Sequence, residues 1–246
     1  MYSVLANKVN PIIMPRSYMI IPLTRIQKLI GERMAKAKLS KPCFYLESKA
    51  DVTELMALRP KLGKSLGIKI TSNAFLIRAL ALAAEKYPIM VGLLEPRDTI
   101  CEPRIRIADA INVGFPVHAS QGLVVPVIRD AAQKTLAQIA RLEKMLTEKA
   151  RSNTLTLEEM EGQTIGLSNL GVYGTDSFFA IPSPAISTIL AVGNVIRMVT
   201  PQDGQMAVRK MMSLSLTVDR IVSDEVYAAK FLGFIIDQLQ NPKQLI

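Results

Sequence analysis

The sequence predicts an α+β domain in which helices cover a mixed β-sheet. The 246 residues are enough for one large domain or two small ones, with a sizeable buried core. Segments with helical periodicity and segments with strand-like alternation both occur, but they do not follow the regular βαβ order of a doubly wound sheet. The chain contains neither an internal repeat nor a glycine-rich phosphate loop.

Residues 1–20 are predicted to form an N-terminal arm or a linker remnant, because prolines interrupt any regular pattern there. Residues 21–246 are then expected to form one core domain. Its first helix should begin at Thr24, since Thr24 and Gln27 have the spacing of a capping box. One face of this helix is apolar. The other face is interpreted as solvated, with anion binding as the alternative, and carries Arg25, Lys28, Arg33, Lys36 and Lys38.

A strand and two helices are expected next. Residues 43–49 are aromatic and partly alternating, which indicates a strand. Each helix should open at a polar cap and close at a glycine or proline: one from Asp51 or Thr53 to Gly63 or Gly67, and one from Thr71 or Ser72 to Tyr87, before Pro88.

The second half of the chain contains further strands and two helices. Residues 104–117 alternate and contain β-branched side chains, and residues 122–128 predict a buried strand with a proline at an edge or bulge. A helix over 135–151 is strongly indicated, because Thr135 and Gln138 form a second capping box. The other expected elements are strands at 163–167, 187–192 and 211–218, and a helix at 224–239.

The composition argues against a membrane protein and against a metal site. No apolar stretch reaches the roughly 18 residues of a membrane span, and the N-terminus has no signal-peptide pattern. With one histidine and two distant cysteines, Cys43 and Cys101, no metal is expected. Both cysteines are interpreted as reduced thiols in a cytosol-like compartment.

The net charge of +9 raises the question of nucleic-acid binding. The basic residues are spread along the chain and are not interleaved with aromatic residues in a recognisable module. No nucleic-acid partner is therefore expected, and anionic ligands or protein partners explain the charge better.

The most informative stretch, residues 216–225 (LTVDRIVSDE), contains two aspartates but no histidine. It resembles L-S-x-D-H-R-x-x-D-G, the signature of the dihydrolipoamide acyltransferases, which form the E2 cores of 2-oxo acid dehydrogenase complexes. Four other segments resemble the same family in order and spacing, from about Ile21 to Ile246: IPLT with IGERM, FYL with ADVT, GLVVPVIRD, and LSNLGVYG.

The resemblance implies a fold, substrates and partners. The family fold is a chloramphenicol-acetyltransferase-like two-layer sandwich, a mixed sheet covered by helices, assembled as a trimer. The substrates would be coenzyme A and lipoamide, without a metal. The homotrimer would stand alone, build a larger cubic or dodecahedral shell, or co-assemble with an active E2. The E1 and E3 components would attach through domains not present in this sequence, in the cytoplasm or in the mitochondrial matrix of a eukaryote.

The resemblance also implies roles for three residues. In the family, the two substrates enter a channel between subunits, a histidine deprotonates a thiol, and a serine hydroxyl stabilises the oxyanion. Ser168 matches that serine and Asp224 matches the last aspartate of the signature, whereas Arg220 stands at the position of the histidine. Taken alone, Ser168 would only lead into the turn before Gly171, and Asp224 would only cap the last helix. Arginine cannot accept a proton, so the base is missing.

Other positions also depart from the family pattern. Ile221 and Glu225 replace the arginine and the glycine of the signature, and Cys43 stands where many members have a histidine. His118 is interpreted as a solvated loop residue, with a distant role in the channel as the alternative. Neither cysteine has an activating partner that the sequence reveals.

Three functions remain open from the sequence. The first is a non-catalytic assembly subunit, a pseudoenzyme similar to the E3-binding protein (protein X). Its C-terminal Gln244-Leu245-Ile246 resembles the apolar tail with which related trimers dock. The second is an active acyltransferase that uses Ser168 and an unorthodox base. The third is a binder of coenzyme A or another anion through the basic first helix.

Overall fold

The computed structural model describes residues 21–95, 102–119, 122–202 and 204–246, and the predicted arm at 1–20 lies outside them. Residues 1–32 and 33–246 form two compact units. In the first unit, the capping box opens helix α1 (Arg25–Ser40) as expected. The Thr24 hydroxyl accepts from the Gln27 amide at 3.2 Å, and the Gln27 side chain accepts from the Thr24 amide at 2.9 Å.

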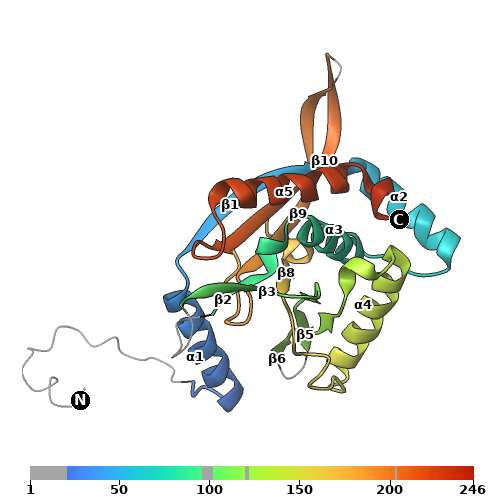
Figure 1. Ribbon diagram of the computed structural model, residues 1–246. Helices are drawn as coiled ribbons and strands as arrows, with labels where there is room; N and C mark the ends of the chain where they lie inside the picture. The colour runs from blue at the N-terminus through green and yellow to red at the C-terminus, as the bar shows by residue number, and fades with distance from the viewer. Residues whose placement is uncertain (1–20, 96–101, 120–121, 203) are drawn as a thin grey trace, which may run out of the picture. The chain divides into compact units, whose positions relative to one another are not determined.

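A six-stranded mixed sheet forms the centre of the second unit (Figure 1). Its order is β1-β10-β9-β8-β4-β7; β9 and β4 run parallel to β8, and the other pairs are antiparallel. The strands are β1 (Cys43–Asp51), β4 (Val113–Gly114), β7 (Val127–Ile128), β8 (Ile165–Asn169), β9 (Thr188–Gln202) and β10 (Gln205–Asp219). Two short hairpins accompany it, β2 (Gly92–Glu95) with β3 (Arg104–Ile107) and β5 (Val117–Ala119) with β6 (Gly122–Val124).

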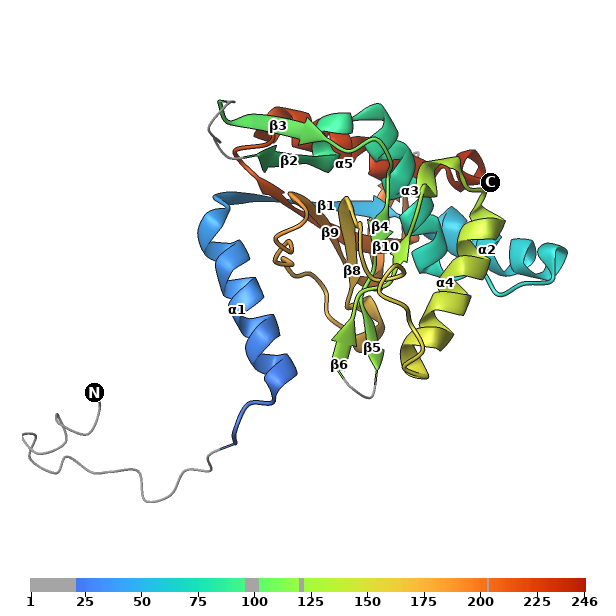
Figure 2. The same cartoon turned by 60° about the horizontal axis from the view of Figure 1, so that its bottom comes forward.

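Helices pack on one face of this sheet (Figure 2). They are α2 (Thr53–Leu66), α3 (Ser72–Lys86), α4 (Leu136–Arg151) and α5 (Glu225–Gln240). Helix α3 is apolar on most sides because it lies between the sheet, α4 and α5, and Phe75 is fully buried. Phe231 of α5 and Leu216 and Val218 of β10 belong to the same core. No helix of the described residues combines the length and apolar character needed to cross a membrane.

The other face of the sheet carries the side chains that alternate with the core residues. In β10, Thr217 and Asp219 alternate with Leu216 and Val218, and in β8, Ser168 follows the core residue Leu167. The segment at 170–187 returns over this face, and its Thr175 carbonyl accepts from the Asn194 amide of β9 at 2.7 Å. Thr217 and Asp219 of the 216–225 stretch therefore lie on the face of the sheet opposite the core helices.

Several predicted strands differ from those observed. The expected strand at 104–117 is divided among β3, β4 and β5, which belong to three different sheets. The expected strand at 122–128 is interrupted before β7, with Pro126 in the gap. The strands predicted at 187–192 and 211–218 are too short. Pairing of β10 with β1 ends at Met211, opposite Asp51, but β9 and β10 continue beyond this point as a two-stranded hairpin.

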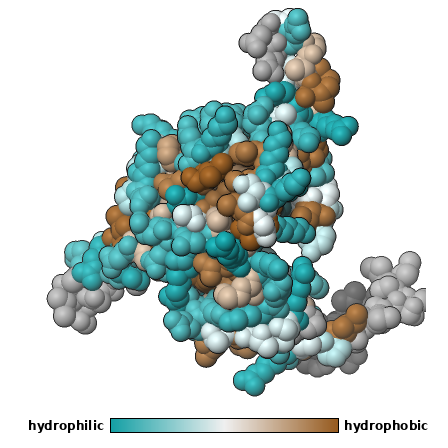
Figure 3. All heavy atoms as spheres, turned by 90° about the vertical axis from the view of Figure 1, so that its right-hand side faces the viewer, coloured by the Kyte–Doolittle hydropathy of each residue, from teal (hydrophilic) through white to brown (hydrophobic). Residues whose placement is uncertain are grey.

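The extension of this hairpin exposes apolar side chains (Figure 3, at the top). Val199 pairs with Val208, and Pro201 pairs with Met206. Val199, Val208 and Met206 are 62%, 63% and 77% exposed. A two-stranded ribbon with an apolar face is only marginally stable in water, so this surface is suited to contact with another chain.

Candidate functional site

Ser168 lies half-buried near the end of β8, directly before a tightly packed turn. The Asn169 side chain holds this turn, since it donates to Asn73 of α3 at 2.7 Å and accepts from the Gly171 amide at 2.9 Å. A Cβ atom on Gly171 would lie 2.2 Å from the carbonyl oxygen of Gly193. Glycine is therefore required sterically, and the backbone that carries Ser168 is closely confined.

Arg220 follows the last residue of β10, and its backbone amide donates to the Pro42 carbonyl at 3.1 Å. Its Nε lies 2.9 Å from Oε1 of Glu225, and these side chains are 52% and 53% exposed. Arg220 and Glu225, two of the residues that differ from the signature, thus pair with each other. Ile221, which also differs from it, is 45% exposed.

Asp224 caps helix α5, as expected from its position. Its Oδ1 accepts from the Tyr227 amide at 2.8 Å, and its backbone is extended, as at other N-caps. One of the two carboxylate oxygens of Asp224 therefore has a structural role as the cap of the helix.

Asp219, the first aspartate of the signature, is buried at 2% exposure. Burial raises the pKa of its carboxyl, against the Ile221 amide and the Lys41 ammonium, which favour the charged form. The Ile221 amide donates to Asp219 Oδ1 at 3.1 Å. This hydrogen bond orients the turn that carries Arg220 and Ile221.

Lys41 is a half-buried lysine beside this turn and was not singled out from the sequence. Its ammonium donates to the carbonyls of Ser183 at 2.8 Å, Pro184 at 3.1 Å and Ile186. Burial lowers its pKa, with the Asp219 carboxylate acting in the opposite direction. An ammonium has three hydrogens, so these carbonyls occupy all of them, and we interpret Lys41 as a structural anchor of the 183–186 segment and not as a base.

Ser168 and Arg220 do not meet within one chain. Ser168 pairs with Ala191, and Ala191 pairs with Ser215, so β10 lies two strands from Ser168. Two strand spacings are about 10 Å, and the four residues from Ser215 to Asp219 add about 13 Å along the strand, which gives roughly 16 Å in all. A site that joins a Ser168 hydroxyl to the side chain at position 220 therefore requires two chains.

The other candidate groups lie elsewhere. His118 is exposed on the β5–β6 hairpin, outside the main sheet. Cys43 opens β1 opposite Asp219. Burial raises the pKa of its thiol and Asp219 raises it further, against the Lys41 and Lys38 ammoniums, which disfavours a reactive thiolate. Cys101 lies outside the described residues.

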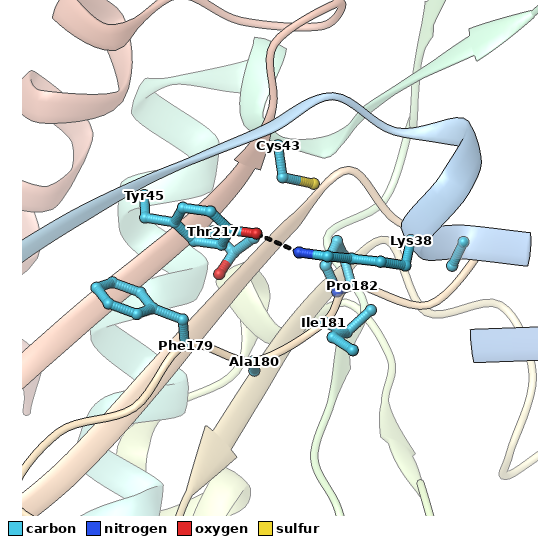
Figure 4. A pocket seen from close by; sticks show the side chains of 9 residues that line it. Lys38, Cys43, Tyr45, Phe179, Ala180, Ile181, Pro182 and Thr217 are labelled. Atoms are coloured by element: carbon cyan, nitrogen blue, oxygen red, sulfur yellow. Dashed lines mark hydrogen bonds between the residues drawn. The ribbon is translucent and has the colours of Figure 1, made fainter. Parts of the chain in front are cut away.

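A pocket of about 280 Å³ lies beside Cys43 (Figure 4). We call it the Lys38 pocket. It is lined by Ala37, Lys38, Cys43, Tyr45, Phe179, Ala180, Ile181, Pro182 and Thr217. Within the described parts of the chain, no three His, Cys, Asp or Glu side chains group as a metal site.

Comparison with protein families gives one match over nearly the whole chain. The model of 2-oxoacid dehydrogenases acyltransferase (catalytic domain) matches residues 15–246. The dihydrolipoyllysine-residue acetyltransferase component of the pyruvate dehydrogenase complex of Rickettsia bellii is 31% identical over 236 residues, which cover 94% of this chain and 55% of the relative. The mitochondrial pyruvate dehydrogenase protein X component of Mus musculus is 30% identical over 230 residues, covering 92% and 44%. The chain thus spans about half the length of these curated relatives.

Solved structures give the same result. The dihydrolipoamide acetyltransferase of Azotobacter vinelandii, studied for the roles of a serine, a histidine and an asparagine in its catalytic mechanism, superposes with a TM-score of 0.86 and 29% identity, over 96% of this chain and 99% of that one. A cubic core of the pyruvate dehydrogenase complex gives a TM-score of 0.86 at 28% identity, with the same coverage. A chloramphenicol acetyltransferase gives 0.50 at 15% identity, over 85% and 94% of the two chains, and so shares the fold alone. The predicted sandwich fold is confirmed.

Proposed function

Because the chain belongs to the 2-oxoacid dehydrogenase acyltransferase family (catalytic domain), we propose that it is a non-catalytic core subunit of a 2-oxo acid dehydrogenase complex. One observation carries this proposal. The position expected for the general base holds Arg220, and Arg220 is paired with Glu225.

The spacing of the site residues supports this assignment. In the Azotobacter protein, the histidine follows the serine by 52 positions, and the asparagine follows the histidine by four. Ser168, Arg220 and Asp224 have the same two spacings. The serine is retained, the histidine has become an arginine, and an aspartate stands for the asparagine.

Thiol acylation needs a proton acceptor that this site lacks. A guanidinium does not lose its proton in proteins, and a carboxylate such as Glu225 is a poor acceptor for a thiol proton. Without general-base catalysis, a factor of about 10²–10⁴ in rate is lost. Lys41 is engaged by three carbonyls and offers no replacement.

The work of the subunit would then be assembly. A family-type homotrimer would bring the Ser168 face of one copy toward the Arg220 end of its neighbour, which one chain cannot do alone. The exposed apolar face of the β9–β10 hairpin supports such contacts. A cubic or dodecahedral shell, co-assembly with an active E2, and attachment of E1 and E3 through segments outside this sequence would follow from the same role. The protein would be located in the cytoplasm of a bacterium or in the mitochondrial matrix.

The proposed docking tail would act through its exposed residues. Leu245 is fully buried in the core of its own chain, within the short helix Pro242–Leu245. Gln244 is exposed, and Ile246, at 60% exposure, is the apolar residue of the tail that remains available for another chain. Truncation tests of assembly should therefore remove Ile246 alone.

An acyl-transfer assay with acetyl-CoA and dihydrolipoamide tests the proposal; because the transfer leaves the total number of thiols unchanged, the products CoA and S-acetyldihydrolipoamide are separated by chromatography and quantified. The unmodified protein should not exceed the uncatalysed rate. Replacing three changed positions together, Arg220→His, Ile221→Arg and Glu225→Gly, should restore some turnover, and adding Ser168→Ala should remove it again. Because Arg220 and Glu225 are paired, Arg220→His alone leaves Glu225 without its partner and is the weaker experiment.

The second candidate is an active acyltransferase with Ser168 and an unorthodox base. The retained Ser168, in a turn confined by Gly171 and Gly193, favours it. Turnover by the unmodified protein that Ser168→Ala abolishes would establish this function and overturn the first.

A further inference from the structure

The polar groups of the Lys38 pocket are all able to donate hydrogen bonds. Lys38 Nζ donates to the Tyr45 hydroxyl at 2.5 Å, which leaves two ammonium hydrogens and the phenolic hydrogen for a ligand (Figure 4). The Cys43 thiol is a weak further donor. Among the described residues, no carboxylate pairs with the Lys38 ammonium, and the hydrogen bond to Tyr45 raises its pKa, so it stays charged.

A buried hydroxyl in the same pocket has no partner. Thr217 is 1% exposed, and its Oγ1 makes no hydrogen bond within the described structure. Figure 4 shows its side chain between Tyr45 and the segment that carries Phe179 and Ala180. Less than 1 Å² of this oxygen is accessible, so it lies behind the surface of the pocket as an unpaired buried group.

The remaining wall is apolar and the space is small. Phe179 stacks against Tyr45 with ring centroids 5.0 Å apart, and Ile181 and Pro182 continue this wall. A volume of about 280 Å³ lies just below the roughly 300–1,000 Å³ of typical ligand pockets and so suits a small ligand. One cation, donors without acceptors and a short apolar wall are complementary to a small anion with an apolar body.

We propose that the Lys38 pocket binds a small monocarboxylate with a short branched or aromatic body. The carboxylate receives hydrogen bonds from Lys38 and Tyr45, and the apolar body lies against Phe179 and Ile181. A phosphate ester fits less well because the second nearby ammonium, that of Lys41, is occupied by backbone carbonyls. This binding site does not depend on acyl transfer, so it stands or falls separately from the function proposed above.

Cys43 serves as a reporter for this site. The chain has two cysteines, so Cys101→Ser leaves Cys43 as the only thiol. Its alkylation rate by iodoacetamide is measured with isovalerate and with isovaleramide, a neutral ligand of the same shape. At twice its dissociation constant, isovalerate should slow the reaction about threefold, and the effect should saturate. Isovaleramide should have no comparable effect.

Two further variants identify the contact. Lys38→Met should abolish the protection by isovalerate, whereas Lys64→Met, which removes another exposed lysine, should leave it unchanged. Calorimetric titration of the unmodified protein should give saturable heat with isovalerate and none with isovaleramide. Equal protection by acid and amide, no protection by either, or protection that survives Lys38→Met would overturn the proposal. Thermal melting checks that each variant is folded.

Discussion

Arg220 donates from Nε to Oε1 of Glu225 across 2.9 Å, so the two residues proposed to stand at the positions of the family's histidine and glycine are bonded to each other. The two positions are five residues apart, on either side of the turn between β10 and α5. An arginine alone would leave a cation at the end of the strand, and a glutamate alone would leave an anion at the helix start. Together they neutralise each other, which explains how the site can lose its base without carrying an unbalanced charge.

We expect this pair to contribute little to stability. Because both side chains are about half exposed, the coupling energy in a double-mutant cycle of Arg220→Ala and Glu225→Ala should be about 0.2–1 kcal/mol. Urea unfolding of the four proteins at low and high salt measures it. A coupling that exceeds about 2 kcal/mol, or that does not weaken with salt, would contradict this expectation.

Two glycine substitutions should change stability in opposite directions. An alanine Cβ at position 193 would lie 1.9 Å from the Asp176 carbonyl oxygen, so Gly193→Ala should destabilise the protein by about 1–3 kcal/mol or more. In helix α5, a Cβ at Gly233 meets nothing within 4 Å, and Gly233→Ala should stabilise by up to about 1 kcal/mol. Thermal and urea unfolding compare them. An unchanged free energy of unfolding for Gly193→Ala would contradict the tight packing described for the turn after Ser168.

Glu143 should make stability fall as the pH rises. It is 6% exposed on α4, and burial raises the pKa of its carboxyl above the ordinary 4.5, against hydrogen bonds from Thr71 and Asn73. The folded protein therefore binds this proton more tightly than the unfolded chain. The stability that Glu143 contributes is fully present below pH 4.5, and it is lost as the pH rises through the pKa that the carboxyl has in the folded protein. Glu143→Gln should remove this loss, as seen in unfolding free energies across that window, whereas the exposed Glu148→Gln should retain it.

The last two residues should have separable effects. Leu245 is fully buried, so Leu245→Ala should lower the free energy of unfolding by about 2–5 kcal/mol. Removing only Ile246 should change it by less than about 0.5 kcal/mol. Light scattering then measures the mass in solution. If Ile246 contributes to docking between trimers, its removal should leave trimers where the unmodified protein forms larger particles; particles of unchanged size would exclude that role.

Local signals predicted several helix ends well, although the cap expected at Asp51 or Thr53 is wrong, since Val52 is the N-cap of α2 and makes no side-chain cap hydrogen bond. The capping box of Thr135 and Gln138 is present with both hydrogen bonds, and Asp224 caps α5. These contacts span three residues, so the sequence contains both partners. Strand limits were predicted less well, because a strand ends where its neighbour ends. The hairpin extension at Val199 and Met206 and the division of 104–117 are consequences of pairing that periodicity does not contain.

The sequence by itself determined the family, and residue identity alone decides that the side chain at position 220 cannot accept a proton, which is the basis of the proposed loss of the base. Only the tertiary structure decided what surrounds that position. Lys41 meets the carbonyl of Ser183, 142 residues away, Glu225 turns back onto Arg220, and Leu245 is buried in its own chain. It also set Ser168 two strands away from β10, so that no single chain can bring it to Arg220. These relationships depend on sheet register and on packing between distant segments, which no local pattern of residues specifies.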